Sequence, residues 1–268
     1  MNTALHWDDT FPLIRLNGAG ARDFLQGQST ADLRPKAAGE LVQSCWLTAT
    51  GRLRALLELR LDGDGADVLV LAGDAEALAS GLDQVIFPAD RVRLGNRRLQ
   101  RRVQGLAPDS PAVWLDPETP LPAALAGSSA LRDAALEQQR LQRGFPPGSA
   151  EVTGDTNPFE LGLADRVSLD KGCYLGQETM AKLASKGGVK QQLRFWRSAQ
   201  PLNTGDPLSN GDDRAGLVTS VLEINNAKWM GLALIRRQHL SAEGLNGPAG
   251  QSLSLERPGQ FQEPPSPV

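Results

Sequence analysis

The chain has 268 residues, of which 40% are apolar and 22% charged, and its net charge at pH 7 is -3. This composition is typical of a globular protein with a substantial core, and it lacks the basic excess of a domain that binds nucleic acid strongly and directly. The first ten residues show no basic segment followed by an apolar run, and no apolar stretch reaches the length of a membrane span. We therefore expect a cytoplasmic protein without a membrane segment.

The first half of the chain alternates short β-like runs with helical patterns. Residues 12–18 and 66–73 read as strands, and residues 42–61 read as a hairpin that turns at Gly51. Helices are expected over residues 20–28 and from Asp74, a good N-cap, to about residue 85. Residues 91–106 read as two strand-like halves around Gly95 and Asn96. Together these patterns predict an α+β fold.

The second half begins with residues 106–127, which are rich in proline and alanine and are expected to form a crossing dominated by loops. A strong helical pattern follows, from Ser128 or Ser129 to Gly144. We expect an α+β region over residues 1–190, in two interleaved subdomains. Alternating β-rich runs over residues 191–256 predict an antiparallel C-terminal β domain, as a barrel or sheet. Residues 257–268 form a tail that we expect to be disordered.

The chain has two cysteines, and in a cytoplasmic protein Cys45 and Cys173 favour free thiols over a disulfide. The two histidines lie far apart without a ligand cluster, so no metal site is predicted. Cys173 lies just before a helical pattern over residues 177–186 and two residues after Lys171, and both features favour a thiolate. No histidine lies nearby in sequence to act as its base, which argues against a Cys-His hydrolase. The residues alone leave two interpretations open: a cysteine that packs beside Tyr174, or a thiol displayed for chemistry.

The segment KGCYLGQE, from Lys171 to Glu178, closely resembles the signature K-G-C-Y-x-G-Q-E of the YgfZ family. These are folate-binding proteins of iron–sulfur maintenance, related to the glycine-cleavage T-protein. Three further segments resemble the family in order and spacing: FLQGQSTADL from Phe24, RLQRGFP from Arg140 and NPFELGL from Asn157. The resemblance covers nearly the whole chain except its tail.

The resemblance implies a ring-like, three-part architecture around a central pocket that suits tetrahydrofolate. Glu160 would accept hydrogen bonds from the donor edge of the pterin, because a carboxylate can accept from two parallel N–H groups. Lys171 and Cys173 would be the functional pair of the signature. Asn157, Tyr174 and Gln177 complete the predicted cofactor-binding set, and the last two would mainly shape the loop. This is the expected site.

The function implied by the resemblance is that of a folate-binding accessory factor for assembly or repair of iron–sulfur proteins, including radical enzymes that modify tRNA. The partners would be folate and iron–sulfur client proteins, and Cys173 would hold a cluster, a persulfide or a one-carbon adduct. The alternative is a folate-dependent aminomethyl or one-carbon transferase. Those relatives carry an acidic pair where this chain has Arg54 and Ala55, and an arginine would oppose developing positive charge. A third alternative is a folate-binding scaffold in which Cys173 only packs.

Overall fold

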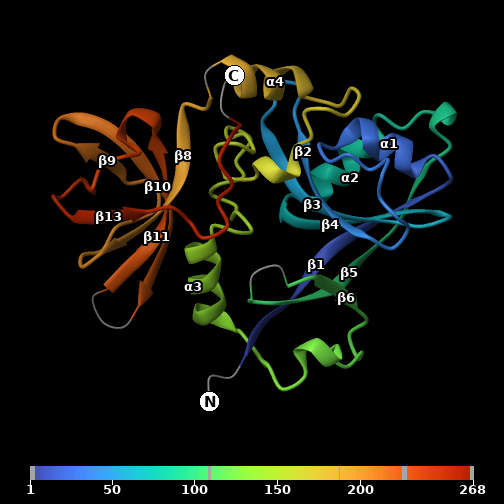
Figure 1. The fold of residues 1–268 in the computed structure, drawn as a ribbon, viewed down its shortest axis with the longest axis horizontal. Helices are drawn as coiled ribbons and strands as arrows, with labels where there is room; N and C mark the ends of the chain where they lie inside the picture. Colours follow the sequence, from blue (N-terminus) through green and yellow to red (C-terminus); the bar gives the residue numbers. More distant parts are fainter. Residues whose placement is uncertain (1–3, 108–109, 187, 225–227, 266–268) are drawn as a thin grey trace.

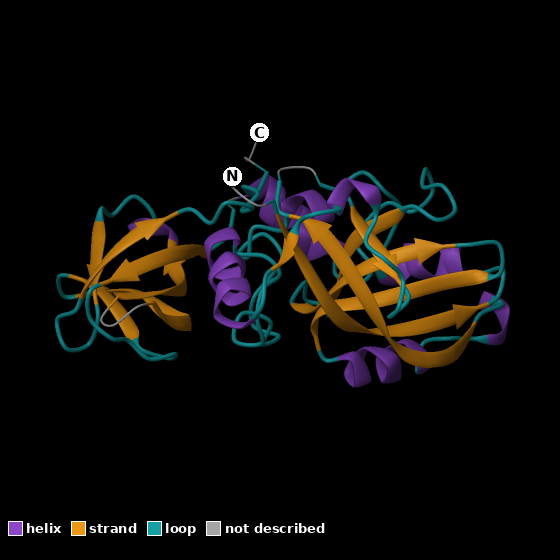
Figure 2. Ribbon diagram, turned by 90° about the horizontal axis from the view of Figure 1, so that it is seen from below, coloured by secondary structure: helices purple, strands orange, loops and turns teal. Residues whose placement is uncertain are grey.

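The structure is a computed structural model that describes residues 4–107, 110–186, 188–224 and 228–265. Figure 1 shows a small β-barrel on one side, a large sheet with helices on the other, and helix α3 (Asp133–Arg143) between them. The view from below in Figure 2 shows the same order of parts. Within the described ranges, no helix is long and apolar enough to cross a membrane.

The larger part is built on a seven-stranded sheet with the order β2-β3-β4-β1-β5-β6, in which β7 also pairs with β1. Neighbouring strands are antiparallel, except that β7 runs parallel to β1. The strands are β1 (Leu5–Asn17), β2 (Leu41–Leu47), β3 (Leu53–Leu61), β4 (Gly65–Gly73), β5 (Arg93–Gly105), β6 (Ala112–Leu115) and β7 (Ser129–Ala130). The predicted hairpin around Gly51 is therefore confirmed as β2 and β3.

One face of this sheet is covered by helices α1 (Ala21–Gln28) and α2 (Ala75–Asp83), both close to their predicted positions. The Asp74 carboxylate caps α2 by accepting hydrogen bonds from two backbone amides, as expected of an N-cap. Alternate residues of the strands point to this face because side chains alternate along a strand. The buried cluster between the sheet and the helices includes Ile14, Leu16, Phe24, Leu25, Leu57, Leu59, Val68, Val70, Leu78 and Leu82.

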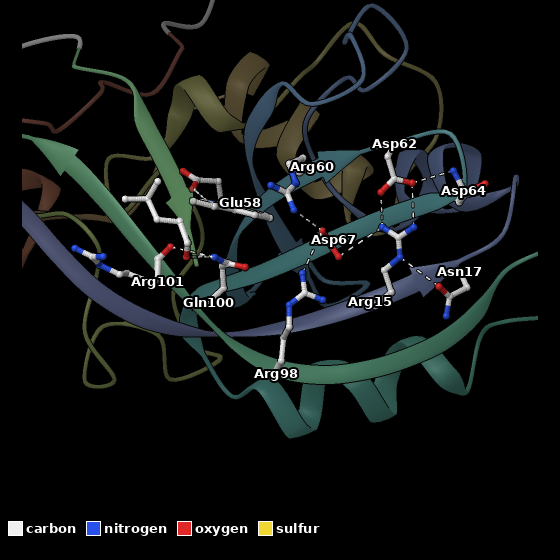
Figure 3. A network of polar contacts seen from close by, with 12 residues as sticks. Arg15, Asn17, Glu58, Arg60, Asp62, Asp64, Asp67, Arg98, Gln100 and Arg101 are labelled. Carbon is white, nitrogen blue, oxygen red and sulfur yellow. Dashed lines mark hydrogen bonds and ion pairs between the residues drawn. The ribbon is translucent and has the colours of Figure 1, made fainter. Parts of the chain in front are cut away.

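The opposite face of the sheet is apolar in one half and charged in the other. The apolar half continues into the barrel, because Leu13 and Leu69 belong to the same buried cluster as the barrel residues Leu193 and Leu232. The charged half is the row of side chains shown in Figure 3, where Asp67 of β4 forms ion pairs with arginines of the strands around it. Its partners and their distances are Arg60 at 2.8 Å, Arg15 at 3.5 Å and Arg98 at 3.6 Å. The interior shared by the two parts therefore lies on the apolar half.

One prediction for the middle of the chain is wrong in detail, and a second one is refined. The two strand-like halves around Gly95 and Asn96 form the single strand β5, because the extra residue is absorbed as a bulge opposite β1. The predicted loop over residues 106–127 contains strand β6. In both cases pairing with a neighbouring strand overrides the local turn signal.

Helix α3 begins at Asp133, four or five residues later than predicted, and ends as expected at Gly144, whose φ is 66°. The delay has a tertiary cause. Residues Ser129 and Ala130 form β7 and pair with Leu5 and His6 at the start of β1. The first residues of the helical pattern therefore adopt an extended conformation, because they pair with a strand more than a hundred residues earlier in the chain.

The C-terminal part is a closed antiparallel barrel with the order β10-β11-β8-β13-β12-β9. Its strands are β8 (Gln191–Ser198), β9 (Pro207–Asn210), β10 (Asp213–Ile224), β11 (Lys228–Arg236), β12 (Gly244–Asn246) and β13 (Ser252–Glu256). Closure leaves none of these strands as an open sheet edge, which removes the hazard of unpaired backbone groups. The predicted α+β fold with a C-terminal antiparallel barrel is confirmed.

The tail does not follow the expectation of disorder over its described part, residues 257–265. The Phe261 side chain is only 8% exposed and belongs to the main buried cluster. The backbone amides of Gly259 and Gln260 donate to the carbonyls of Gln142 and Arg143 at the end of α3. The amide of Gln262 also donates to the carbonyl of Gly162, so one buried aromatic ring and three backbone hydrogen bonds hold a segment whose composition indicated disorder. Residues 266–268 lie outside the described part.

Candidate functional site

The loop from Lys171 to Gln177, called the signature loop below, leads into helix α4 (Gln177–Lys186), which has the predicted bounds. It is held against the end of α1 by hydrogen bonds across some 140 residues of sequence. The Lys171 ammonium donates to the carbonyls of Ser29 and Ala31, each at 2.7 Å. The amide of Leu175 donates to the carbonyl of Gly27 at 3.1 Å. These contacts join the two segments FLQGQSTADL and KGCYLGQE into one structural unit.

Lys171 is buried, with 6% of its surface exposed. Burial lowers the pKa of its ammonium to about 8; Asp32 opposes this shift and Arg34 adds to it. Its Nζ lies 4.9 Å from the centroid of the Tyr174 ring, a cation–π contact. Lys171 therefore anchors the loop through buried hydrogen bonds, and its ammonium is not exposed to solvent.

The other end of the signature loop is fixed by Gly176 and Gln177. Gly176 has φ at 85°, and a Cβ there would lie 2.7 Å from the carbonyl oxygen of Thr48, in the turn between β2 and β3. Only glycine combines this conformation with such a close approach. The Gln177 side-chain amide donates to the carbonyl of Lys171 at 3.1 Å and closes the loop on itself. The loop is thus held at both ends.

Cys173 lies between these fixed ends and is exposed, whereas Cys45 is buried. Neither cysteine forms a disulfide. Burial raises the pKa of the Cys45 thiol to about 12, so this thiol stays protonated. A cysteine that only packs would show low exposure, and Cys173 does not. In the part of the chain that the structure describes, no cluster of three or more His, Cys, Asp or Glu residues could hold a metal ion.

Glu160 and Asn157 hold one another in a tight turn. The backbone amide of Asn157 donates to Glu160 Oε2 at 3.0 Å, and the backbone amide of Glu160 donates to Asn157 Oδ1 at 3.1 Å. Burial raises the pKa of Glu160, against the hydrogen bond from Asn157 and the charge of Arg52. Glu160 lines a polar pocket of about 840 Å³, whose other lining residues are Arg52, Asp155, Lys190, Gln191, Arg236, Arg237 and Gln238.

A second hollow, called the apolar cavity below, lies between the sheet and α3 and measures about 730 Å³. Strands β1 and β4 form one wall, and α3 with the segment after it forms the other. Its apolar lining residues include Trp7, Phe11, Leu71, Leu136, Phe145, Pro146 and Val152. Aromatic and aliphatic walls of this extent are characteristic of sites for flat organic ligands.

The predicted site residues thus fall into two groups. Lys171, Tyr174 and Gln177 contact one another around Cys173, and Asn157 contacts Glu160. Among the described residues, no hydrogen bond or ion pair connects the two groups, and none of them lines the apolar cavity. Sequence reasoning expected a central pocket but did not assign the segment RLQRGFP to it, although this segment supplies part of α3 and of the residues after it that line the cavity.

The hairpin β2–β3 supplies no free carboxylate at Arg54 and Ala55, the positions where an acidic pair would be expected in an aminomethyltransferase. The guanidinium of Arg54 stacks on Trp46 at 4.3 Å, and Ala55 is fully buried. Glu58 is buried and accepts two hydrogen bonds of 2.8 Å from Arg102. The nearest acid on this strand is therefore engaged in a structural ion pair.

Comparison with known proteins supports both the fold and the sequence resemblance, although no protein-family model matches the chain. A solved structure of the glycine cleavage system aminomethyltransferase T from Bartonella henselae aligns with a TM-score of 0.71 and 17% identity, covering 97% of this chain and 88% of that one. An uncharacterized protein of Haemophilus influenzae is 25% identical over 243 residues, which are 82% of this chain and 85% of that protein.

Two further relatives extend the comparison. A protein of Escherichia coli named tRNA-modifying protein YgfZ is 26% identical over 227 residues, covering 69% of each chain. A chloroplastic protein of Arabidopsis thaliana, provisionally named a transferase, is 31% identical over 148 residues. That match covers 52% of this chain but only 33% of the plant protein, so the chain spans about a third of that relative.

Proposed function

Because the chain is YgfZ-like in sequence and T-protein-like in fold, we propose that it is a folate-binding accessory factor that supports iron–sulfur enzymes, including enzymes that modify tRNA. In this proposal a tetrahydrofolate binds inside the protein and Cys173 acts at its surface. The iron–sulfur cluster in this proposal belongs to a client protein.

The apolar cavity fits a folate in size and chemistry. Its volume of about 730 Å³ falls within the range of about 300–1,000 Å³ usual for cofactor sites. Tetrahydrofolate consists of a pterin, an aminobenzoyl ring and a glutamate, so it needs flat apolar walls and a few polar contacts. Trp7, Phe11 and Phe145 offer such walls. The bound folate would carry one-carbon units or protect a reactive group.

The place of Glu160 and Asn157 in folate binding stays a prediction. Their turn faces the polar pocket, which has charged walls and little apolar surface to cover a pterin. A buried carboxyl group with a raised pKa can still accept or donate at a pterin edge. Titration of 5-formyltetrahydrofolate into the wild type and Glu160→Ala tests both points: no binding by the wild type would refute the folate proposal, and equal affinities would remove Glu160 from the site.

The observation that carries the accessory role is the exposed Cys173 in a loop that is fixed at both ends. A thiol on a rigid surface loop can meet a protein partner without first ordering the loop, which lowers the entropic cost of the encounter. Buried Lys171 keeps the loop in place from below. The client protein would determine whether the thiol holds a cluster, a persulfide or a one-carbon adduct.

Complementation tests the thiol. Cells that lack their own YgfZ-like protein would receive the wild type, Cys173→Ala, or the matched control Cys45→Ala, and the activity of an iron–sulfur enzyme that modifies tRNA would be measured. We expect Cys173→Ala to keep its fold and folate affinity but to lose client support. Full activity in cells that carry Cys173→Ala would overturn the role of this thiol.

The alternative, a one-carbon transferase, is less well supported. Such chemistry needs a carboxylate near the reacting nitrogen of the folate, and Glu58 on the hairpin is already neutralised by Arg102. Turnover of an amine donor in the presence of tetrahydrofolate would favour this alternative over an accessory role.

A further inference from the structure

The last turn of α3 places Arg143 on the wall of the apolar cavity. Its guanidinium is partly buried and forms no hydrogen bond or ion pair with any residue in the described ranges. Burial lowers the pKa of Arg143, and the positive charge of Arg102 lowers it further. A cation that is withdrawn from water without an acceptor raises the free energy of the folded protein.

The other arginines around this cavity are neutralised within the protein. Arg140, one turn earlier on α3, donates two hydrogen bonds of 2.7 Å to Glu137 and lies 3.5 Å from Glu151. Arg102 donates from Nε and Nη2 to the carboxylate of Glu58. Arg143 is therefore the cation of this wall that lacks a carboxylate partner among the described residues.

Four carboxylates line the same cavity, and among the described residues none of them forms an ion pair with Arg143. Asp74 caps α2, Asp9 accepts from the amide of Thr10, and Glu137 is bound to Arg140. Asp133 is exposed and, within the described part of the chain, its carboxylate forms no ion pair. The cavity thus combines apolar walls with one guanidinium, that of Arg143, which forms no ion pair among the described residues.

Arg143 is not needed to cap the end of its helix. A cation in the last turn complements the helix dipole, but the final carbonyls of α3 already have donors. The carbonyls of Gln142 and Arg143 accept from the amides of Gly259 and Gln260 in the tail, and the carbonyl of Arg140 accepts from the amide of Phe145. The backbone of the helix end is satisfied without the Arg143 guanidinium, which leaves its five donors for another acceptor.

We infer that Arg143 is the anion receptor of the apolar cavity, and that the ligand of this cavity is a flat, largely apolar molecule with a carboxylate at one end. A guanidinium and a carboxylate form two parallel charge-assisted hydrogen bonds, which are strongest away from water. A folate glutamate carboxylate meets this description, and that assignment rests on the proposed function. The aromatic body of the ligand would then lie along Trp7 and Phe145.

Two matched ligands and two matched variants test the inference. The ligands are 5-formyltetrahydrofolate and its dimethyl ester, which differ only in the two carboxylates. We expect Arg143→Gln to weaken binding of the acid by roughly 10- to 100-fold, the range of a charge-assisted pair, and to leave binding of the ester unchanged. Arg143→Lys should retain part of the affinity for the acid. Arg97→Gln, which removes an exposed arginine of β5 that pairs with Glu76 of α2, should alter the binding of neither ligand.

The outcomes separate this inference from the proposed function. If Arg143→Gln binds the acid as tightly as the wild type does, Arg143 only complements the helix end, and the inference is overturned while folate binding stands. If the wild type binds neither folate, the proposed function fails. The inference is then decided by 1-anilinonaphthalene-8-sulfonate and its uncharged parent N-phenyl-1-naphthylamine. Arg143→Gln must weaken the sulfonate about 10-fold or more and spare the neutral probe; any other result refutes it.

Discussion

The burial of Lys171 predicts an unusual dependence of stability on pH. The folded protein holds the pKa of this ammonium at about 8, against 10.5 for an exposed lysine. Between these two values the unfolded chain binds the proton and the folded chain does not. The free energy of unfolding therefore rises with pH through this window, and the contribution is lost as pH falls through 8.

The size of the effect follows from the shift. Each unit of pKa difference corresponds to about 1.4 kcal/mol, so a difference of about 2.5 units corresponds to about 3.5 kcal/mol in all. About 2.5 kcal/mol of it should appear between pH 7 and pH 10, because the unfolded lysine is still partly protonated at pH 10. Such a gain is a sizeable fraction of the stability of an ordinary domain, about 5–15 kcal/mol.

The assay compares the wild type with Lys171→Met by urea denaturation at pH 7, 8, 9 and 10. The difference between their unfolding free energies cancels the other titrating groups. We expect this difference to grow by about 2.5 kcal/mol in favour of the wild type as pH rises from 7 to 10. Lys182→Met, on the exposed face of α4, serves as the control and should follow the wild-type curve. Parallel curves for the wild type and Lys171→Met would refute the reasoning.

Three further predictions concern stability and thiol reactivity. Glu58→Gln leaves the charge of Arg102 buried and uncompensated, and it should lower the free energy of unfolding by about 3–5 kcal/mol in urea denaturation. Gly176→Ala forces a Cβ into a backbone carbonyl at positive φ, which should cost about 1–3 kcal/mol and loosen the signature loop, measurable as a lower Tm. In the native protein, iodoacetamide should modify Cys173 and spare the buried Cys45, as mass spectrometry of peptides would show.

Each of these predictions has a result that would contradict it. The double variant Glu58→Met with Arg102→Met should recover most of the stability lost in Glu58→Gln, and an equal loss would deny the charge argument. Gly27→Ala places its Cβ in open space on a helix, so it should be neutral or stabilising. A loss of stability in Gly27→Ala as large as that in Gly176→Ala would mean that this region tolerates no alanine in place of glycine, whatever the backbone conformation. Equal labelling of both cysteines before denaturant is added would mean that Cys45 is reached by local opening.

Local signals located most of the elements. The turn at Gly51, the Asp74 cap and helix α4 were predictable because each depends on residues within a few positions of one another. The signature loop was also recognisable, since its glycines and its cysteine occur together in one short segment. The antiparallel barrel followed from alternating runs and turn residues.

Contacts between distant segments decided the rest. Ser129 and Ala130 join β1 instead of starting a helix, and Phe261 draws the tail onto the core. Lys171 looked like a reactive neighbour of Cys173, but carbonyls about 140 residues away hold it inside the protein. Arg143 became notable only when folding placed it on an apolar wall, where it has no carboxylate partner among the residues that the structure describes. Periodicity and capping describe which backbone conformation a segment prefers, whereas burial and charge pairing depend on which segments meet, and that is a property of the whole chain.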